Sequence, residues 1–386
     1  MKTNSIAALL CALFSCTVNA QTFDAFYGSL VDNVSYTNIL NDLTTFENFG
    51  VKEVGTNALT NAENWIVQRY QNLGYTNVEL QEFTYASGTS NNIIITKTGT
   101  VYPNTFLIID GHYDTINGPG ANDNGSGTVL ILELARLLKD VDTEYSIKFI
   151  HFSGEEDGLW GSSYYVNNTV NPQNLNISLV FNIDEVGGVS GQVNDTIVCE
   201  EDRSSPPTNN AASTEATIQL ANCMELYSNL NTEISFAYGS DYIPFENNGE
   251  VITGLFEKNQ SPYAHSPNDT LANMDVSYLT EVTKGSLGAA LHFAIGTEAL
   301  STPQFTNDEL KIYNDTSTNT LHIDFETPAP ETPSMYISDT LGKIVLNSTS
   351  LENQFNSIST ASLSKGIYVV NVSSGSKSLN KKIVIH

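Results

Sequence analysis

The chain has 386 residues, of which 43 are acidic and 16 are basic, and its formal net charge at pH 7 is −27. A surface with this charge repels the phosphates of nucleic acids and the headgroups of anionic lipids, so we expect neither as a partner. The chain is longer than one ordinary hydrophobic core requires, and we therefore expect two folded domains.

The first twenty residues have the pattern of a secretory signal peptide. Lys2 precedes an apolar run over 6–14, and Val18-Asn19-Ala20 places small or short side chains where a signal peptidase cleaves. The run is too short to span a bilayer, and no later stretch reaches the roughly 20 apolar residues of a membrane helix. We therefore predict a secreted protein, extracellular or at the cell surface, without a membrane anchor.

Cysteine usage leads to a disulfide prediction. The chain has four cysteines, and cleavage after Ala20 removes Cys11 and Cys16. Cys199 and Cys223 then remain in an oxidising compartment, where two cysteines allow one pairing. We predict a disulfide between them; the alternative is a pair of buried free thiols.

From about Phe23 to Leu300, short apolar runs alternate with helical stretches. The runs rich in Ile, Val and Phe predict buried strands at 92–97, 106–111, 146–153 and 178–184. Helical periodicity or length predicts helices at 126–138, 160–167, 214–230 and 276–296. This alternation predicts an α/β domain over 21–300, with a mostly parallel central sheet and helices on both faces.

After Leu300 the helical periodicity ends and short alternating strands follow, separated by Pro and Gly. The predicted strands cover 310–313, 320–325, 334–338, 343–346, 366–372 and 381–385. They predict a small β-sandwich over 301–386, joined by a linker around 301–306. This region has no cluster of ligand residues, and we expect His322 and His386 to lie on its surface.

Acidic and imidazole side chains follow three of the predicted strands. His112 and Asp114 follow the strand at 106–111, Glu155 and Glu156 follow the next strand, and Asp184 ends the third. Open α/β sheets bind their ligands at the carboxyl ends of strands. The common placement of these residues therefore indicates a functional site.

Two residues outside the strand ends complete a metal-binding set. Asp123 lies in a loop rich in Gly, Pro and Asn, and His265 lies in a polar loop far downstream. A hydrolytic two-metal site needs a bridging carboxylate, terminal ligands and a spare carboxylate for the proton of the attacking water. A carboxylate on a tight turn offers one oxygen to each metal, so we favour Asp123 as the bridge. A capped turn and an exposed loop histidine are the alternative interpretations.

Three successive acids, Glu155, Glu156 and Asp157, would repel one another unless a cation or a proton relieved them. We assign Glu156 to the metal and Glu155 to general base and then general acid; a solvated acidic turn is the alternative.

The roles of Asp114 and Asp184 follow from their position in the sequence. Asp114 shares a strand face with His112, so we predict that it orients this imidazole rather than binding metal. Asp184 has Glu185 as a competitor, and we prefer Asp184 because it directly ends the apolar run.

Together these segments, from about residue 56 to residue 296, resemble metallopeptidase family 28, the secreted di-zinc aminopeptidases related to glutamate carboxypeptidase. The resemblance implies a site with two zinc ions, a catalytic acid and base at Glu155, and a cis peptide bond after Asp123. The implied zinc ligands are Asp123 as the bridge, His112 and Asp184 on one ion, and Glu156 and His265 on the other.

One segment departs from the family pattern. The family's Ser-Asp-His segment appears here as Ser240-Asp241-Tyr242. The change leaves the ligands intact, and we predict that Tyr238 or Tyr242 supplies a phenol on the substrate side.

The last eighty or so residues resemble the sorting domain of type IX secretion. The resemblance rests on the segment 363–372, the turn at 339–343 and the closing strand at 381–385. It implies that the type IX secretion machinery is a partner.

We therefore predict an enzyme that hydrolyses the N-terminal peptide bond of peptides with two zinc ions. Three alternatives stay open: a glutaminyl cyclase-like acyltransferase with a single zinc, a carboxypeptidase, and a binding module without catalysis. Few basic residues lie near the motifs to receive a substrate carboxylate, which disfavours the carboxypeptidase.

Overall fold

The computed structural model describes residues 21–205, 207–237, 239–297, 305, 309–329, 332–339, 343–348, 351–375 and 377–385. The predicted signal peptide and most of the predicted linker lie outside these residues. The chain divides into two compact units between Glu298 and Ala299.

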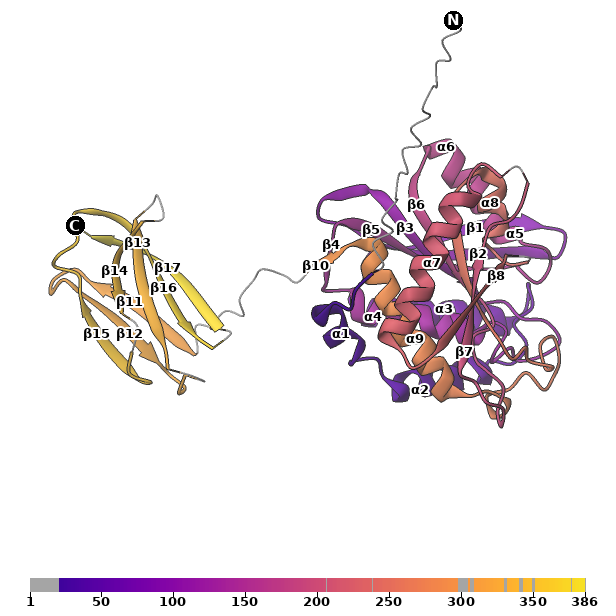
Figure 1. The fold of residues 1–386 in the computed structure, drawn as a ribbon, viewed down its shortest axis with the longest axis horizontal. Coiled ribbons are helices and arrows are strands. Elements are labelled where there is room, and N and C mark those ends of the chain that lie inside the picture. Colours follow the sequence, from indigo (N-terminus) through magenta and orange to yellow (C-terminus); the bar gives the residue numbers. More distant parts are fainter. Residues whose placement is uncertain are drawn as a thin grey trace, which may run out of the picture. The chain divides into compact units, whose positions relative to one another are not determined.

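An eight-stranded sheet forms the centre of the N-terminal unit (Figure 1). Its strand order is β1-β2-β5-β3-β6-β9-β7-β8. The pairs β5/β3, β3/β6, β6/β9 and β7/β8 are parallel, and the other three pairs are antiparallel. The strands are β1 (Val78–Tyr85), β2 (Gly88–Lys97), β3 (Tyr102–His112), β5 (Tyr145–Phe152), β6 (Asn176–Ile183), β7 (Thr196–Glu201), β8 (Asn231–Phe236) and β9 (Ile252–Glu257). A short pair, β4 (Asp142–Thr143) and β10 (Gly296–Thr297), lies apart from this sheet.

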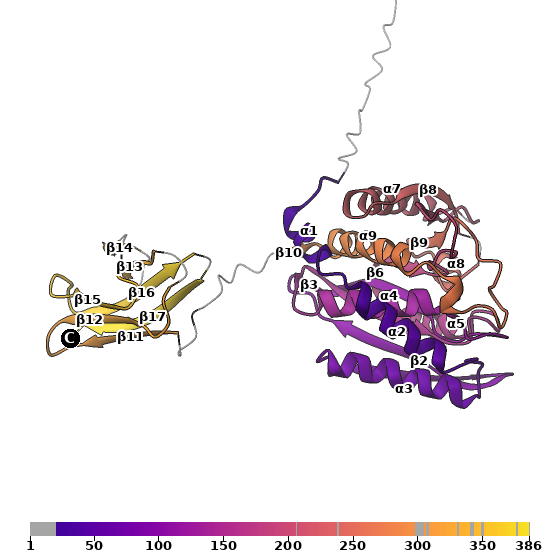
Figure 2. The ribbon, with the colours of Figure 1, turned by 90° about the horizontal axis from the view of Figure 1, so that it is seen from below.

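Helices cover both faces of the sheet (Figures 1 and 2). Ile93 and Ile95 of β2 belong to a large core formed with α1, α2, α3, α4, α7 and α9, whereas Ile94 belongs to a second core with α5 and α8. Alternate residues of one strand thus enter opposite cores, as the period of two in a strand requires. The helices are α1 (Ala25–Val31), α2 (Tyr36–Asn48), α3 (Asn57–Asn72), α4 (Gly125–Leu138), α5 (Trp160–Tyr165), η1 (Val166–Val170), α6 (Asn171–Gln173), α7 (Asn210–Tyr227), α8 (Ile243–Asn248), η2 (Leu271–Asn273) and α9 (Val276–Ala294).

The predicted α/β architecture is confirmed, with a sheet that is mixed at its edges. The first three helices and strands β1, β7, β8 and β9 were not predicted individually, because their apolar residues are interspersed with polar ones. The predicted helix at 160–167 is an α-helix over Trp160–Tyr165, and a π-helical turn follows over Val166–Val170. In the described part of the chain, no helix combines the length and the apolarity that a bilayer crossing requires.

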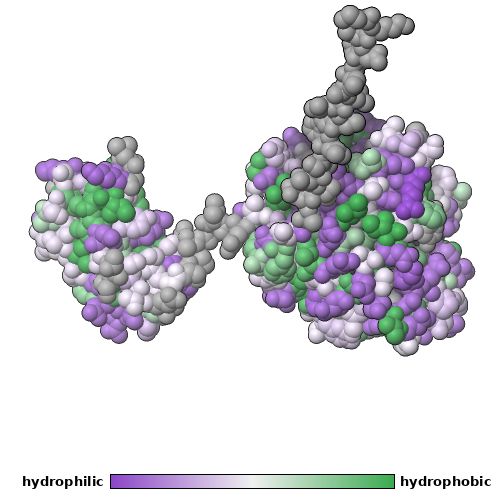
Figure 3. Space-filling model, viewed as in Figure 1, coloured by the Kyte–Doolittle hydropathy of each residue, from purple (hydrophilic) through white to green (hydrophobic). Residues whose placement is uncertain are grey.

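The C-terminal unit consists of two antiparallel sheets that share one hydrophobic core, as a β-sandwich does. One sheet has the order β11-β12-β15 and the other β14-β13-β16-β17. Hydrophobic residues also gather on part of the surface of this unit (Figure 3). The strands are β11 (Leu310–Asp315), β12 (Thr320–Phe325), β13 (Ser334–Asp339), β14 (Ile344–Ser348), β15 (Phe355–Ser359), β16 (Gly366–Ser374) and β17 (Lys377–Ile385). Only β15 was missing from the prediction.

The predicted disulfide is wrong for this structure, in which Cys199 and Cys223 are both free and buried. Cys199 lies in β7 and Cys223 in α7, and both side chains pack in the large core as small apolar groups. Burial raises the pKa of Cys223 to about 12 and raises that of Cys199 as well. Both thiols therefore stay protonated and unreactive at neutral pH.

We predict two free thiols per chain in protein expressed from Gln21, which lacks the other two cysteines. Thiol titration after unfolding without reductant should give two per chain, and reductant should leave the melting temperature unchanged. A count of zero, or a melting temperature that falls on reduction, would show that the pair is oxidised.

Candidate metal centre

Three neighbouring strands bring four of the predicted site residues to one edge of the sheet. β3 lies between β5 and β6 and is parallel to both. It ends at His112, while β5 ends shortly before Glu155 and Glu156, and β6 ends directly before Asp184. Because the carboxyl ends of parallel strands meet at one edge, these side chains lie close together.

The loop before α4 presents Asp123 to this edge. Gly120 has a positive φ of 59°, and a Cβ atom there would lie 2.3 Å from the backbone oxygen of Asp123, so the turn requires glycine. Asn124 then caps α4, because its side-chain oxygen accepts a hydrogen bond from the backbone N–H of Gly127 at 2.9 Å. The Asp123–Asn124 peptide bond is cis, as the family resemblance implied.

Two buried charged residues hold this loop in place. The carboxylate of Asp269 accepts hydrogen bonds from the backbone N–H groups of Asn122 at 2.9 Å and Asp123 at 3.0 Å. The ammonium of Lys52, which is fully buried, donates to the carbonyl oxygens of Pro119 at 2.6 Å and of Gly50 at 2.9 Å. Hydrogen bonds to the carboxylate of Asp269 are stronger than those between neutral groups, while burial lowers the pKa of Lys52 to about 7. Together the contacts of both residues fix the backbone on both sides of the turn.

The other four predicted ligands lie around Asp123. One of its oxygens, Oδ1, lies 3.3 Å from Nε2 of His112, and the other, Oδ2, lies 3.1 Å from Nε2 of His265. The same nitrogen of His112 lies 3.3 Å from Oδ1 of Asp184, and that of His265 lies 2.9 Å from Oε2 of Glu156. Asp123 thus stands between two pairs of donors, each with one imidazole and one carboxylate.

The donor atoms fit a cation. Those of His112, Asp123 and Glu156 all lie within 4.8 Å of one another. The side chain of Glu156 is 3% exposed, and its Oε1 atom has no hydrogen-bond partner within the described part of the chain. Burial and the neighbouring carboxylates raise the pKa of Glu156 to about 10, which means that ionisation is costly without a positive charge nearby. Imidazole and carboxylate are also the nitrogen and oxygen ligands that zinc accepts.

Asp114 lies beside His112, but its backbone oxygen and not its carboxylate is the group nearest to the imidazole. The Nδ1 atom of His112 is 3.1 Å from the backbone oxygen of Asp114, which can only accept a hydrogen bond. A proton on Nδ1 leaves the lone pair of Nε2 free toward Asp123 and Asp184. The carboxylate of Asp114 also accepts from the backbone N–H groups of Glu155 and Glu156, at 3.3 Å each. Asp114 therefore links the imidazole of His112 to the turn with Glu155 and Glu156.

Glu155 lies within electrostatic reach of the cluster, but no described residue makes a hydrogen bond to its carboxylate. Burial raises its pKa to about 8; the carboxylates of Asp184, Asp114 and Asp123 add to the increase, while His112 opposes it. A carboxyl group with its pKa shifted toward neutrality is common at functional sites.

Ser240 is a site residue that sequence reasoning did not assign. Its hydroxyl donates to Oδ2 of Asp184 at 2.8 Å, which leaves Oδ1 of Asp184 toward His112. Ser240 lies in a segment that was already singled out, but the contact joins positions 56 residues apart and has no local pattern. Oδ1 of Asp184, the residue preferred over Glu185 from the sequence, lies 3.3 Å from Nε2 of His112.

Of the two tyrosines predicted on the substrate side, the structure describes only Tyr242. Tyr242 is 1% exposed, packs in the smaller core and donates its hydroxyl to Oε2 of Glu200 at 2.8 Å, so its burial gives the prediction no support. Tyr238 lies outside the described residues. His151 is a buried core histidine as expected, with Nε2 at 2.9 Å from the hydroxyl of Tyr70.

Comparison with known proteins identifies both units. Residues 92–290 match peptidase family M28, and residues 311–386 match the secretion system C-terminal sorting domain. The chain is 32% identical over 211 residues to the aminopeptidase YwaD of Bacillus subtilis, a match that covers 53% of this chain and 44% of that protein. The chain therefore spans less than half the length of this relative.

Solved structures share the fold of this chain. The LapA aminopeptidase of Legionella pneumophila superimposes with a TM-score of 0.63 at 19% identity, covering 77% of this chain and 81% of that one. A glutaminyl cyclase of Macrostomum lignano gives a TM-score of 0.62 at 15% identity, covering 72% and 95%. At these identities the likeness concerns the fold and does not separate the two reactions. The family match extends over half of the sequence, and the chain belongs to peptidase family M28.

Proposed function

We propose that this chain is a secreted aminopeptidase that uses two zinc ions to hydrolyse the N-terminal peptide bond of peptides. One observation carries the proposal: Asp123 directs one oxygen to each of two separate imidazole and carboxylate pairs. A single-metal site has no need for a second pair of ligands, so this arrangement favours the hydrolase over a glutaminyl cyclase. The aminopeptidase relative supports the same reaction class.

The proposed ligands are those that converge on Asp123. His112 and Asp184 would hold one ion, His265 and Glu156 the other, and Asp123 would bridge them. Zinc at such a site supplies a Lewis acid that polarises a carbonyl oxygen and makes an attacking water more acidic. Glu155 takes the proton of that water and returns it to the leaving amine. Asp114 holds His112 and the turn with Glu155 and Glu156 in place through its hydrogen bonds.

Export and domain organisation are part of the same proposal. A signal peptide at 1–20 would precede the peptidase domain at 21–300 and the sorting domain at 301–386. The match of residues 311–386 to a sorting domain supports delivery by the type IX secretion machinery to the outside or the cell surface. Peptides outside the cell are then the expected substrates.

Glu155→Gln tests the assignment of the proton carrier. The amide cannot accept a proton, so kcat should fall by about 100-fold to 10,000-fold while zinc content stays unchanged. Glu156→Gln is the matched control and should lower the zinc content instead. If Glu155→Gln loses zinc and Glu156→Gln keeps it, the two glutamates have exchanged roles.

A second assay distinguishes the peptidase from the glutaminyl cyclase. We expect the unaltered protein to hydrolyse peptides and not to cyclise N-terminal glutamine; the reverse result favours the cyclase.

Metal removal tests the number of ions. Chelation followed by dialysis should abolish hydrolysis and lower the melting temperature, since a ligand at 100 times its Kd stabilises by about 2.7 kcal/mol. Adding zinc back should restore activity with saturation at two equivalents per chain. Full activity at one equivalent contradicts the bridged site.

Asp269→Asn tests whether the loop clamp positions Asp123. The variant loses one of two charge-assisted hydrogen bonds, so we expect destabilisation by about 1.5–3 kcal/mol and zinc affinity weakened by about 10-fold to 100-fold. Asp275→Asn is a matched control, because Asp275 accepts from the backbone N–H groups of Ser277 and Tyr278 at the start of α9. Zinc affinity that falls equally in both variants points to general destabilisation rather than positioning.

A further inference from the structure

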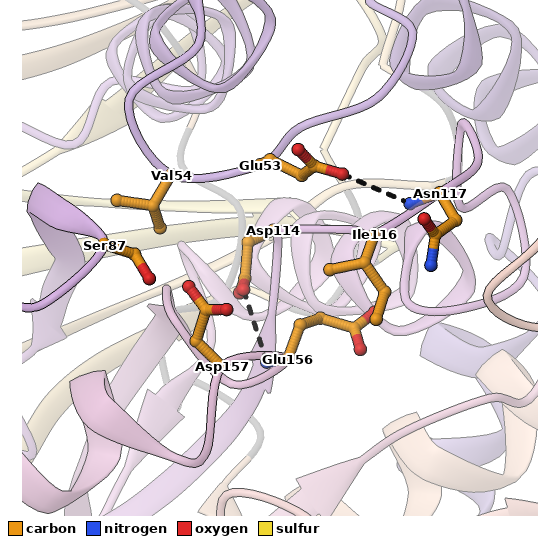
Figure 4. A pocket seen from close by; sticks show the side chains of 8 residues that line it. All are labelled: Glu53, Val54, Ser87, Asp114, Ile116, Asn117, Glu156 and Asp157. Atoms are coloured by element: carbon orange, nitrogen blue, oxygen red, sulfur yellow. Dashed lines mark hydrogen bonds between the residues drawn. The ribbon is translucent and has the colours of Figure 1, made fainter.

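A cavity of about 280 Å³ adjoins the candidate metal centre and has the metal-binding candidate Glu156 in its wall (Figure 4). Figure 4 shows Glu53 and Val54 on one side, Glu156 and Asp157 on the opposite side, and Asp114 between them. The cavity is near the lower end of the range for small-molecule sites, so it suits one side chain rather than a long peptide. Glu156 thus belongs both to the cavity wall and to the candidate metal centre.

The lining is acidic. Four of the lining residues carry carboxylates: Glu53, Asp114, Glu156 and Asp157, and the lining that the structure describes includes no basic side chain. Glu156 is a proposed metal ligand, so the negative charge that is left for another ligand lies on the other carboxylates of the lining. A cluster of negative charge in a partly enclosed space attracts a cation and repels an anion.

Among these carboxylates, Glu156 is a proposed metal ligand and Asp114 accepts from two backbone N–H groups. The other two, those of Glu53 and Asp157, have neither role. Asp157 accepts a hydrogen bond at 2.6 Å from the hydroxyl of Tyr85, whose ring stacks on Trp160 with 5.1 Å between centroids. Glu53 accepts from the backbone N–H of Asn117 at 3.4 Å. In each case the second carboxylate oxygen accepts no hydrogen bond from the part of the chain that is described. Both residues are exposed, so the free oxygens are available to a ligand.

The cavity is also partly apolar, because Val54 and Ile116 contribute to its wall. This combination excludes a bare metal ion, which needs a tight shell of oxygen atoms and makes no use of aliphatic walls. A lysine or arginine side chain matches both parts, since its aliphatic stem packs on apolar groups while its charged end reaches the carboxylates.

We propose that this cavity is a specificity pocket for a lysine or arginine side chain of the peptide, adjacent to the bond that is cut. Glu53 and Asp157 receive the charged end, and Val54 and Ile116 contact the aliphatic stem. The inference rests on the proposed peptidase function and adds a substrate class to it: peptides with a basic residue at the first or second position.

Selectivity ratios test the pocket and locate the basic residue. One arm compares kcat/KM for lysyl, arginyl, norleucyl and glutamyl amides of one fluorogenic amine; norleucine has the lysine stem without the charge. The other arm keeps leucine first and compares lysine with norleucine in second place. We expect the zinc-loaded protein to prefer the basic residue by about fivefold or more in one arm, since each exposed ion pair is worth up to about fivefold and the pocket offers two carboxylates.

The double variant Glu53→Gln/Asp157→Asn should lower the lysine to norleucine ratio by about fivefold or more, and added salt should lower it in the unaltered protein. Glu79→Gln/Glu82→Gln is the matched control, because it removes two exposed charges from the neighbouring strand β1 and should keep the ratio. A ratio near one in both arms, or a ratio that the pocket variant leaves unchanged, overturns the proposal.

Equilibrium binding separates this proposal from the peptidase function. Calorimetry on the zinc-loaded protein should show lysine amide binding about fivefold or more tightly than norleucine amide, with the difference lost in the pocket variant. If no peptide is hydrolysed but this difference exists, the peptidase function fails and the cation pocket stands. If peptides are hydrolysed but both amides bind equally, the pocket fails and the peptidase function stands.

Discussion

The position of Asp123 is the constraint on which the rest of the site depends. Its two oxygens face two imidazoles that come from distant parts of the chain, at the end of β3 and in the loop before α9. Burial opposes the ionisation of Asp123, but the two neighbouring imidazoles hold its pKa below the ordinary value. A carboxylate that stays ionised in a buried place is what a bridging ligand has to be. The glycine turn, the cap of α4 and the Asp269 clamp all serve to keep it there.

The site also concentrates negative charge that the fold alone does not compensate. Asp123, Asp184, Glu156 and Glu155 lie together, and burial raises the pKa of Glu155 and of Glu156 in the absence of a cation. A purely structural cluster of this kind would be destabilising, because burial makes ionisation of Glu155 and Glu156 costly. Divalent cations would remove this penalty and use the same oxygens as ligands. The cost of the cluster is therefore an argument for its function.

Much of this arrangement could be predicted from the sequence, because the determinants were local. The apolar runs before His112, Glu155 and Asp184 marked three strands, and the common edge of a parallel sheet placed their ends together. The contacts of Asp269 and Ser240 could not be predicted in the same way, since each joins residues that are far apart in the chain. The disulfide failed for a related reason: the compartment permits pairing, but Cys199 and Cys223 pack as separate core side chains. Tyr242 was expected near substrate, and its contact with Glu200 depends on packing that no motif records.

Anomalous scattering at the zinc absorption edge, measured on crystals of the zinc-loaded protein, tests the central claim most directly. The account predicts two peaks, each within coordination distance of a different oxygen of Asp123, one beside His112 and Asp184 and the other beside His265 and Glu156. A single peak, or peaks that do not touch Asp123, would contradict it.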